Sequence, residues 1–190
     1  MKTIKNTLVI ALALTLVSFT TSLIKKDVKV TDSTITWTGH KLTGKHEGTI
    51  NLKEGTLTFD AKKLIAANFI IDMTSINTTD LKGEGKTNLD GHLKSDDFFN
   101  VKEFPTATFK TTEISLKEKS GSYDVTGDMT IKGITNPVTF TMHVTEHSAT
   151  AKLKVNRAKH KVKYGSSSFY DNLKDKVISD EFDLDIKLSF

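Results

Sequence analysis

Hydrophobic and polar residues alternate along most of this chain. The clearest example runs from Phe182 to Phe190, where apolar side chains occupy every second position and polar ones fill the positions between them. Successive side chains of a β-strand point to opposite faces, so this pattern predicts strands with one dry face and one wet face. It recurs at 123–131 and at 138–144. Several such strands in one small domain are typical of a closed antiparallel barrel or a sandwich.

The first half of the chain carries the same signal less evenly. Val28 and Val30 open the predicted strands, and Lys53-Glu54-Gly55 predicts a hairpin turn between two of them. The segment from Asn77 to Pro105 breaks the rhythm, and its apolar spacing predicts a short helix over 88–99. We expect this helix to close one end of the barrel.

The N-terminus predicts a secretory signal peptide over residues 1–22. Lys2 and Lys5 precede an apolar run from Leu8 to Phe19, and small polar residues follow. The alternative is an uncleaved anchor, although the run is shorter than the ~20 residues that a spanning helix needs. We therefore expect an exported protein, periplasmic or extracellular, with one domain over 23–190.

Composition narrows the function classes. The chain of 190 residues has a formal charge of +4, and removing residues 1–22 leaves 25 basic against 23 acidic residues. This near balance predicts no nucleic-acid partner. There is no cysteine, so disulfides, thiol chemistry and a lipidated cysteine are excluded.

The sequence shows no recognisable catalytic pattern. His143 and His147 lack an H-E-x-x-H context, and no G-x-S-x-G or phosphate-binding loop occurs. His92 lies near Asp90, Asp96 and Asp97, which makes a hydrolase or metal enzyme conceivable, but acids near helix ends are common. We predict that the protein is not an enzyme and uses no metal or cofactor.

Three blocks of the chain carry a family resemblance. They are IDMTSINTTD at 71–80, GHLKSDDFFNVKEFPTATF at 91–109 and YDVTGDMTIKGITNPVTF at 123–140, with VNR at 155–157 and the terminal alternating strand in support. Together they resemble the YceI-like family of lipid- or polyisoprenoid-binding proteins. The resemblance implies an all-β fold, an extended eight-stranded antiparallel lipocalin-like barrel with a helix inserted before Phe98. It also implies export, an apolar tunnel for an isoprenoid or another amphiphilic lipid, and a homodimer.

The predicted ligand-binding residues are the apolar side chains on one face of each strand, together with two phenylalanines that cap one end. They are Ile35, Trp37, Ile50, Leu52, Leu57, Phe59, Phe69, Ile71, Met73, Phe98, Phe99, Phe109, Val125, Met129, Ile131, Val138, Phe140 and Met142. An eight-stranded barrel is just wide enough either to fill with side chains or to hold one small ligand. Two functions therefore stay open: an exported carrier, store or sensor that contacts membranes transiently, or a stress-related envelope protein with a filled barrel and no ligand.

Overall fold

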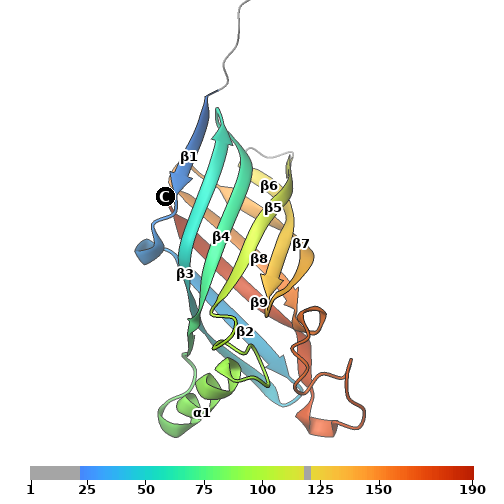
Figure 1. The fold of residues 1–190 in the computed structure, drawn as a ribbon. Helices are drawn as coiled ribbons and strands as arrows, with labels where there is room; N and C mark the ends of the chain where they lie inside the picture. The colour runs from blue at the N-terminus through green and yellow to red at the C-terminus, as the bar shows by residue number, and fades with distance from the viewer. Residues whose placement is uncertain (1–21, 118–120) are drawn as a thin grey trace, which may run out of the picture.

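The computed structural model describes residues 22–117 and 121–190, which form a closed barrel with a helix at one end (Figure 1). The wall runs in the order β3-β2-β9-β8-β7-β6-β5-β4, and β4 pairs back to β3, so eight strands close the ring. Every neighbouring pair is antiparallel. The predicted eight-stranded antiparallel barrel with a short helix is confirmed. Residues 1–21 of the predicted signal peptide lie outside the described residues.

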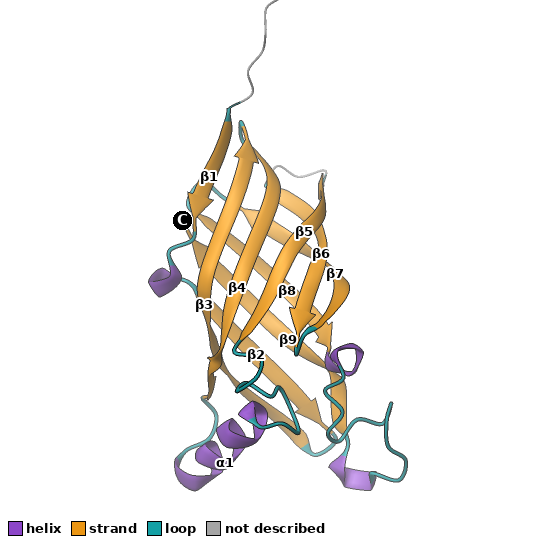
Figure 2. Ribbon diagram, in the orientation of Figure 1, coloured by secondary structure: helices purple, strands orange, loops and turns teal. Residues whose placement is uncertain are grey.

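Strands account for most of the described chain (Figure 2). In chain order the elements are β1 (Leu23–Asp27), η1 (Val30–Asp32), β2 (Thr34–Lys41), β3 (Gly44–Asp60), β4 (Lys63–Thr78), α1 (Gly83–Lys94), β5 (Thr106–Leu116), β6 (Ser122–Ile131), β7 (Ile134–Val144), β8 (Ser148–Asn156), η2 (Arg157–His160), η3 (Lys174–Lys176) and β9 (Ile178–Ser189). Strand β1 pairs with the end of β3 that lies far from α1. The barrel therefore has two distinct ends, one with β1 and one with α1.

The apolar residues of the alternating pattern face the inside of the barrel, and the polar residues between them face the outside. On β8, Ala149, Ala151 and Val155 are almost fully buried, while the lysines between them point outward. Lys152 forms an ion pair with Asp185 of β9 at 2.7 Å, and Lys154 forms one with Asp183 at 3.0 Å. Opposite charges directly across an antiparallel pair add modest stability and fix which face is wet.

The predicted start of the first strand is wrong. Val28 lies between β1 and η1, and Val30 begins η1. The Val28 amide donates to the Gly55 carbonyl of β3 at 2.8 Å, and the Lys29 amide donates to the Ser189 carbonyl of β9 at 2.7 Å. The chain thus passes from β3 to β9 here, and Val28 is buried as part of the core. Its burial, rather than a strand, explains the apolar signal.

The predicted hairpin turn at Lys53-Glu54-Gly55 is also wrong. Strand β3 continues through it to Asp60, and its register with β4 shifts between Leu52 and Glu54. A glycine inside a strand often marks such a bulge. The hairpin turn lies further on, where Ala61 adopts a positive φ of 53°.

The helix begins and ends earlier than the predicted range of 88–99. It spans Gly83–Lys94, and the Ser95 amide closes its end on the His92 carbonyl at 3.1 Å. None of the helix residues is buried, so hydrophobic spacing in the sequence does not indicate where the helix begins. Lys86 instead holds this part by donating to Asn77 Oδ1 at 2.6 Å. Phe98 and Phe99 consequently lie in the turn after the helix.

Strand β7 is paired with β8 over only a short part of its length. It pairs with β8 only between Met142–Val144 and Ala149–Ala151. Further down, η2 bridges the two strands: Asn136 donates to the Lys159 carbonyl at 3.0 Å, and His160 Nδ1 lies 2.8 Å from the Ile134 carbonyl. Burial lowers the pKa of His160, which favours the neutral imidazole. This bridge closes the barrel beside the cavity described below.

Close packing at Gly48 gives a first testable prediction. A Cβ placed there would lie 2.5 Å from the Trp37 ring and would overlap the Asn77 carbonyl oxygen. Because the obstacle includes backbone, we expect Gly48→Ala to lower the free energy of unfolding by about 1–3 kcal/mol. Gly39→Ala is the matched control, since nothing lies within 4 Å of its Cβ position. Urea unfolding of both variants measures the difference, and equal stabilities would contradict the packing described.

Candidate ligand-binding cavity

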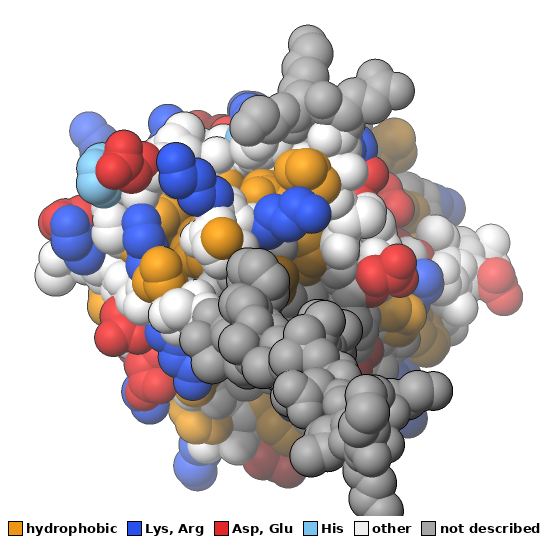
Figure 3. All heavy atoms as spheres, turned by 90° about the horizontal axis from the view of Figure 1, so that it is seen from above, with side chains coloured by type: hydrophobic (Ala, Val, Ile, Leu, Met, Phe, Trp, Pro, Cys, Tyr) orange, Lys and Arg blue, Asp and Glu red, His pale blue; other side chains and the backbone are white. Residues whose placement is uncertain are grey.

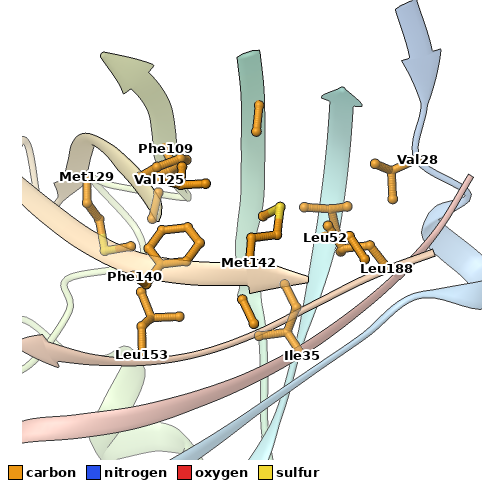
Figure 4. Packing of buried hydrophobic residues seen from close by; sticks show 14 of the residues in the cluster. Val28, Ile35, Leu52, Phe109, Val125, Met129, Phe140, Met142, Leu153 and Leu188 are labelled. Carbon is orange, nitrogen blue, oxygen red and sulfur yellow. The ribbon is translucent and has the colours of Figure 1, made fainter. Parts of the chain in front are cut away.

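An apolar cavity occupies the barrel from its middle towards the end that carries α1. Its volume is about 160 Å³, room for on the order of ten water molecules at roughly 15 Å³ each. Figure 4 shows side chains from different strands, including Phe140, Met142 and Leu52, pointing into this interior. The apolar wall consists of Ile35, Trp37, Ile50, Leu52, Phe69, Ile71, Met73, Ile76, Leu93, Phe98, Phe99, Ala107, Phe109, Met129, Ile131, Phe140, Met142, Leu153, Ile178, Phe182, Leu184, Ile186 and Leu188.

The end with β1 is filled instead. Leu57 and Val125 have no exposed surface there, and the rings of Phe59 and Phe190 lie 6.1 Å apart. Lys26 closes this end with its ammonium 4.9 Å from the centre of the Phe190 ring. The barrel is therefore solid in one half and hollow in the other.

Most of the predicted ligand-binding residues line the cavity. The exceptions are Leu57, Phe59 and Val125, which belong to the core outside the cavity, and Val138, which packs against the core without reaching the cavity. The two predicted caps, Phe98 and Phe99, meet edge to face with ring centres 5.0 Å apart and do line one end. That the lining residues bind a ligand stays a prediction.

Sequence reasoning missed one wall of the cavity. Phe182, Leu184 and Ile186 of β9 all line it, and each keeps partial exposure because it faces the empty volume. The signal was present, because β9 shows the cleanest alternation in the chain. Leu93 of α1 and Leu153 of β8 were missed as well. The α1 residue joins the lining only because the helix folds across the barrel end.

A buried arginine organises the hollow end. Arg157 follows β8, is 2% exposed and also lines the cavity. Its guanidinium donates to four backbone carbonyls, those of Val162, Tyr164, Ile178 and Ser179, at 2.8–2.9 Å. Burial lowers the pKa of Arg157, and the nearby Asp180 opposes this shift. A guanidinium is not deprotonated in proteins, so we treat the group as charged.

Arg157 therefore ties the loop after η2 to the start of β9. Its guanidinium carbon also lies 5.4 Å from the centre of the Phe98 ring, a cation–π distance. Because most of its donors are occupied, we assign it to holding the cavity wall rather than to capturing a ligand.

The cavity lining also includes polar residues, and most of them lie at its rim, the end that carries α1. They are His40, Arg157, Ser179 and Glu181, whereas Thr108 lies within β5. His40 Nε2 lies 2.7 Å from Asp183 Oδ2, and this contact, together with one from Lys154, lowers the pKa of Asp183. An apolar pocket with a few polar groups at one end suits a molecule with a long apolar tail.

The histidine considered for catalysis sits among aromatic rings. The His92 ring packs edge-on against the rings of Tyr164 and Phe98, with distances between ring centres of 4.3 Å and 5.8 Å. The neighbouring Asp90 points elsewhere and accepts hydrogen bonds from the Thr78 amide and Lys86. Within the described parts of the chain, no three His, Cys, Asp or Glu side chains gather in a way that could hold a metal ion.

The attachment of α1 to the barrel gives a second testable prediction. Burial alone would raise the pKa of Asp90, but hydrogen bonds from Lys86 and Thr78 outweigh it and lower the pKa below its ordinary value of 3.8. A lowered carboxyl pKa stabilises the folded state above the unfolded value, and that contribution disappears as the pH falls through the folded one. We expect Asp90→Ala to cost about 1–2 kcal/mol at pH 7.

The difference between the native chain and Asp90→Ala should shrink as the pH falls below 3.8. Thermal unfolding at a series of pH values measures it. The matched control is Asp97→Ala, an exposed carboxylate just past the helix. A gap between native chain and Asp90→Ala that is constant down to the lowest pH at which both fold would contradict the role of the ionised carboxylate.

The structure defines a closed eight-stranded antiparallel β-barrel with an apolar cavity, and comparison with known proteins assigns it to one family. The model of the YceI-like domain matches residues 27–190, so the chain belongs to the YceI-like domain family. Protein YceI of Escherichia coli O6:H1 is 42% identical over 94 residues, which are 48% of this chain and 45% of that protein. A Yersinia enterocolitica relative, UPF0312 protein YE1254, is 37% identical over 100 residues, 52% of this chain and 48% of the relative. These matches thus span about half the length of the curated relatives.

Solved structures show the same fold. BcnA of Burkholderia cenocepacia superposes with a TM-score of 0.69 at 24% identity, covering 86% of this chain and 99% of BcnA. A polyisoprenoid binding domain from Saccharophagus degradans, implicated in plant cell wall breakdown, superposes with a TM-score of 0.57 at 16% identity, covering 90% and 98% of the two chains. At these identities the similarity establishes the architecture alone.

Proposed function

We propose that the mature chain is exported and holds a polyisoprenoid or another long apolar or amphiphilic lipid in the barrel cavity, as a carrier, store or sensor. The observation that carries this proposal is the apolar cavity at the α1 end, lined from every strand of the ring. The related fold of a polyisoprenoid binding domain supports the choice of ligand class. Burial of a hydrocarbon needs no cofactor and no reacting group.

The size of the cavity limits how the ligand is held. A volume near 160 Å³ does not take a long prenyl chain without movement of side chains. Met73, Met129 and Met142 line the cavity, and methionine is the apolar side chain that adapts most easily to a new shape. We therefore expect the chain to displace these side chains, to extend through the rim, or both.

Energetics favour reversible binding. Each methylene removed from water contributes ~0.8 kcal/mol, so a five-carbon prenyl unit contributes roughly 4 kcal/mol. A membrane lipid already rests in an equally dry bilayer, so most of this gain vanishes when the chain moves from bilayer to protein. Ordering the ligand then adds a cost. The transfer free energy is accordingly expected to be close to zero.

Partition between protein and liposomes tests the proposal. A radiolabelled polyprenol is equilibrated with liposomes and the mature chain, and the two are separated by flotation. We expect both fractions to hold label, with a ratio that follows the amounts of protein and lipid. Near-total retention on the protein would contradict reversible transfer, and no label on the protein would contradict binding.

Export rests on the N-terminal pattern of basic, apolar and small polar residues. Within 22–117 and 121–190, none of the helices is both long and apolar enough to cross a membrane. The mass of the chain recovered from the producing cells tests the proposed cleavage, which removes about 22 residues. The expected homodimer stays a prediction. The alternative function, a filled barrel acting through its surface, draws no support from the cavity.

A further inference from the structure

The hollow end of the barrel exposes a group of large apolar side chains, three of them aromatic. Tyr164, Phe169 and Tyr170, in the loop before β9, are 46%, 40% and 50% exposed, and Leu42, in the β2–β3 turn, is 74% exposed. The Leu42 amide donates to the Val177 carbonyl at 3.3 Å, which holds the turn beside the loop. We call these four exposed residues the rim patch. Exposed aromatic side chains in one small area mark an interaction surface more often than scattered single residues do.

The segment that carries the three aromatic residues of the rim patch has a net positive charge. Between residues 159 and 177, the exposed side chains include the lysines at 159, 161, 163, 174 and 176 against the acids at 171 and 175, a net charge of +3. The Lys163 ammonium lies 5.3 Å from the centre of the Phe169 ring, so charge and aromatic surface are intermixed. Aromatic rings with lysines around them are the composition that membrane interfaces favour.

The rim patch lies close to α1 and to the loop that forms part of the cavity wall. Tyr164 contacts His92 of α1 and also belongs to the loop that Arg157 ties to the cavity wall. The rim patch therefore lies beside the end of the barrel towards which the cavity extends (Figure 1). A hydrocarbon that leaves a bilayer for this cavity avoids water only if the rim meets the bilayer.

We propose that the rim patch docks the barrel on an anionic phospholipid bilayer, with the cavity end facing the acyl chains. This proposal rests on the proposed lipid-binding function, because it gives the lipid a dry route. The lysines would meet the anionic headgroups, and the aromatic rings would sit at headgroup level. Docking is shallow and reversible, since a few rings and lysines bury little apolar surface.

The opposite end provides a built-in comparison. Leu23, Ile24, Ile65 and Leu116 are also exposed there, and Figure 3 shows apolar and lysine side chains together on that face. The interior behind them is filled by Leu57 and its neighbours. Contact at that end would give a lipid no passage, so it serves as the matched control.

Co-sedimentation with vesicles tests the proposal. The mature chain is mixed with vesicles of phosphatidylcholine alone or with added phosphatidylglycerol. We expect binding to the anionic vesicles that weakens with salt. A triple variant, Tyr164→Ser, Phe169→Ser and Tyr170→Ser, and a double variant, Lys163→Glu and Lys174→Glu, should each bind about tenfold less or weaker still. The control variant, Ile24→Ser with Leu116→Ser, should bind as the native chain does.

Several results would overturn docking by the rim. These are no vesicle binding by the native chain, equal binding to neutral vesicles, or loss of binding in the control but not in the rim variants. Thermal unfolding of each variant confirms that it is folded. Polyprenol uptake is measured on the same preparations in the absence of vesicles. Uptake without vesicle binding removes the docking proposal alone, whereas vesicle binding without uptake removes the lipid-binding function.

Discussion

Replacing Arg157 with alanine is expected to lower the free energy of unfolding by about 3–5 kcal/mol. The change removes a buried charge that donates to four backbone carbonyls at 2.8–2.9 Å and leaves those carbonyls without partners. Hydrogen bonds from a charged group contribute about 1.5–3 kcal/mol each and are not additive, so the total falls short of their sum. In a domain of this size the midpoint of thermal unfolding should fall by roughly 10 °C.

Two further variants make this prediction specific. Lys159→Ala removes an exposed positive charge two residues away and should change stability by less than about 0.5 kcal/mol. Arg157→Lys keeps the charge but lacks the planar fork, so it should recover only part of the loss. Denaturant unfolding of all three measures the effect. A loss below about 1 kcal/mol in Arg157→Ala would show that the carbonyls find other partners, contrary to the organising role given to this arginine.

The second large effect concerns ligand uptake. Leu184 of β9 faces the cavity, so tryptophan at this position would occupy much of the 160 Å³. We expect Leu184→Trp to reduce polyprenol uptake by more than about tenfold, equivalent to roughly 1.4 kcal/mol. Stability should hold or rise, because filling a cavity often adds about 0.5–2 kcal/mol.

The control for this variant lies on the same strand. Lys187 is exposed and points to the outer face of β9, so Lys187→Trp adds the same ring outside the barrel. Its uptake should equal that of the native chain. Equal uptake by Leu184→Trp and Lys187→Trp, with both variants folded, would show that the ligand does not occupy this part of the barrel.

The alternation of apolar and polar residues predicted the barrel well because inside and outside follow directly from strand geometry. It could not separate a filled interior from a hollow one. Phe59 and Phe69 occupy equivalent positions in the pattern, yet Phe59 packs against Phe190 in the solid half and Phe69 lines the cavity. The difference arises from how far each lies along the barrel, which depends on strand register and closure.

Polar contacts explain the other two features that the sequence did not predict, the start of α1 and the role of Arg157. The first turns of α1 are held by Lys86 and Asp90 rather than by apolar residues, so hydrophobic spacing placed the helix too late. Arg157 was not expected in the cavity wall, because charged residues are rarely fully buried unless they are paired. The VNR sequence at 155–157 marked the position, but its role depends on carbonyls that only the folded loop brings together.

The central claim is that the cavity at the α1 end holds a long apolar lipid. Native mass spectrometry of the chain, purified from its own cells without detergent, tests this most directly. The expected result is a complex heavier than the mature polypeptide, whose extra mass disappears after extraction with organic solvent and matches a prenyl or acyl lipid. A bare polypeptide that also takes up no polyprenol when it is supplied would contradict the claim.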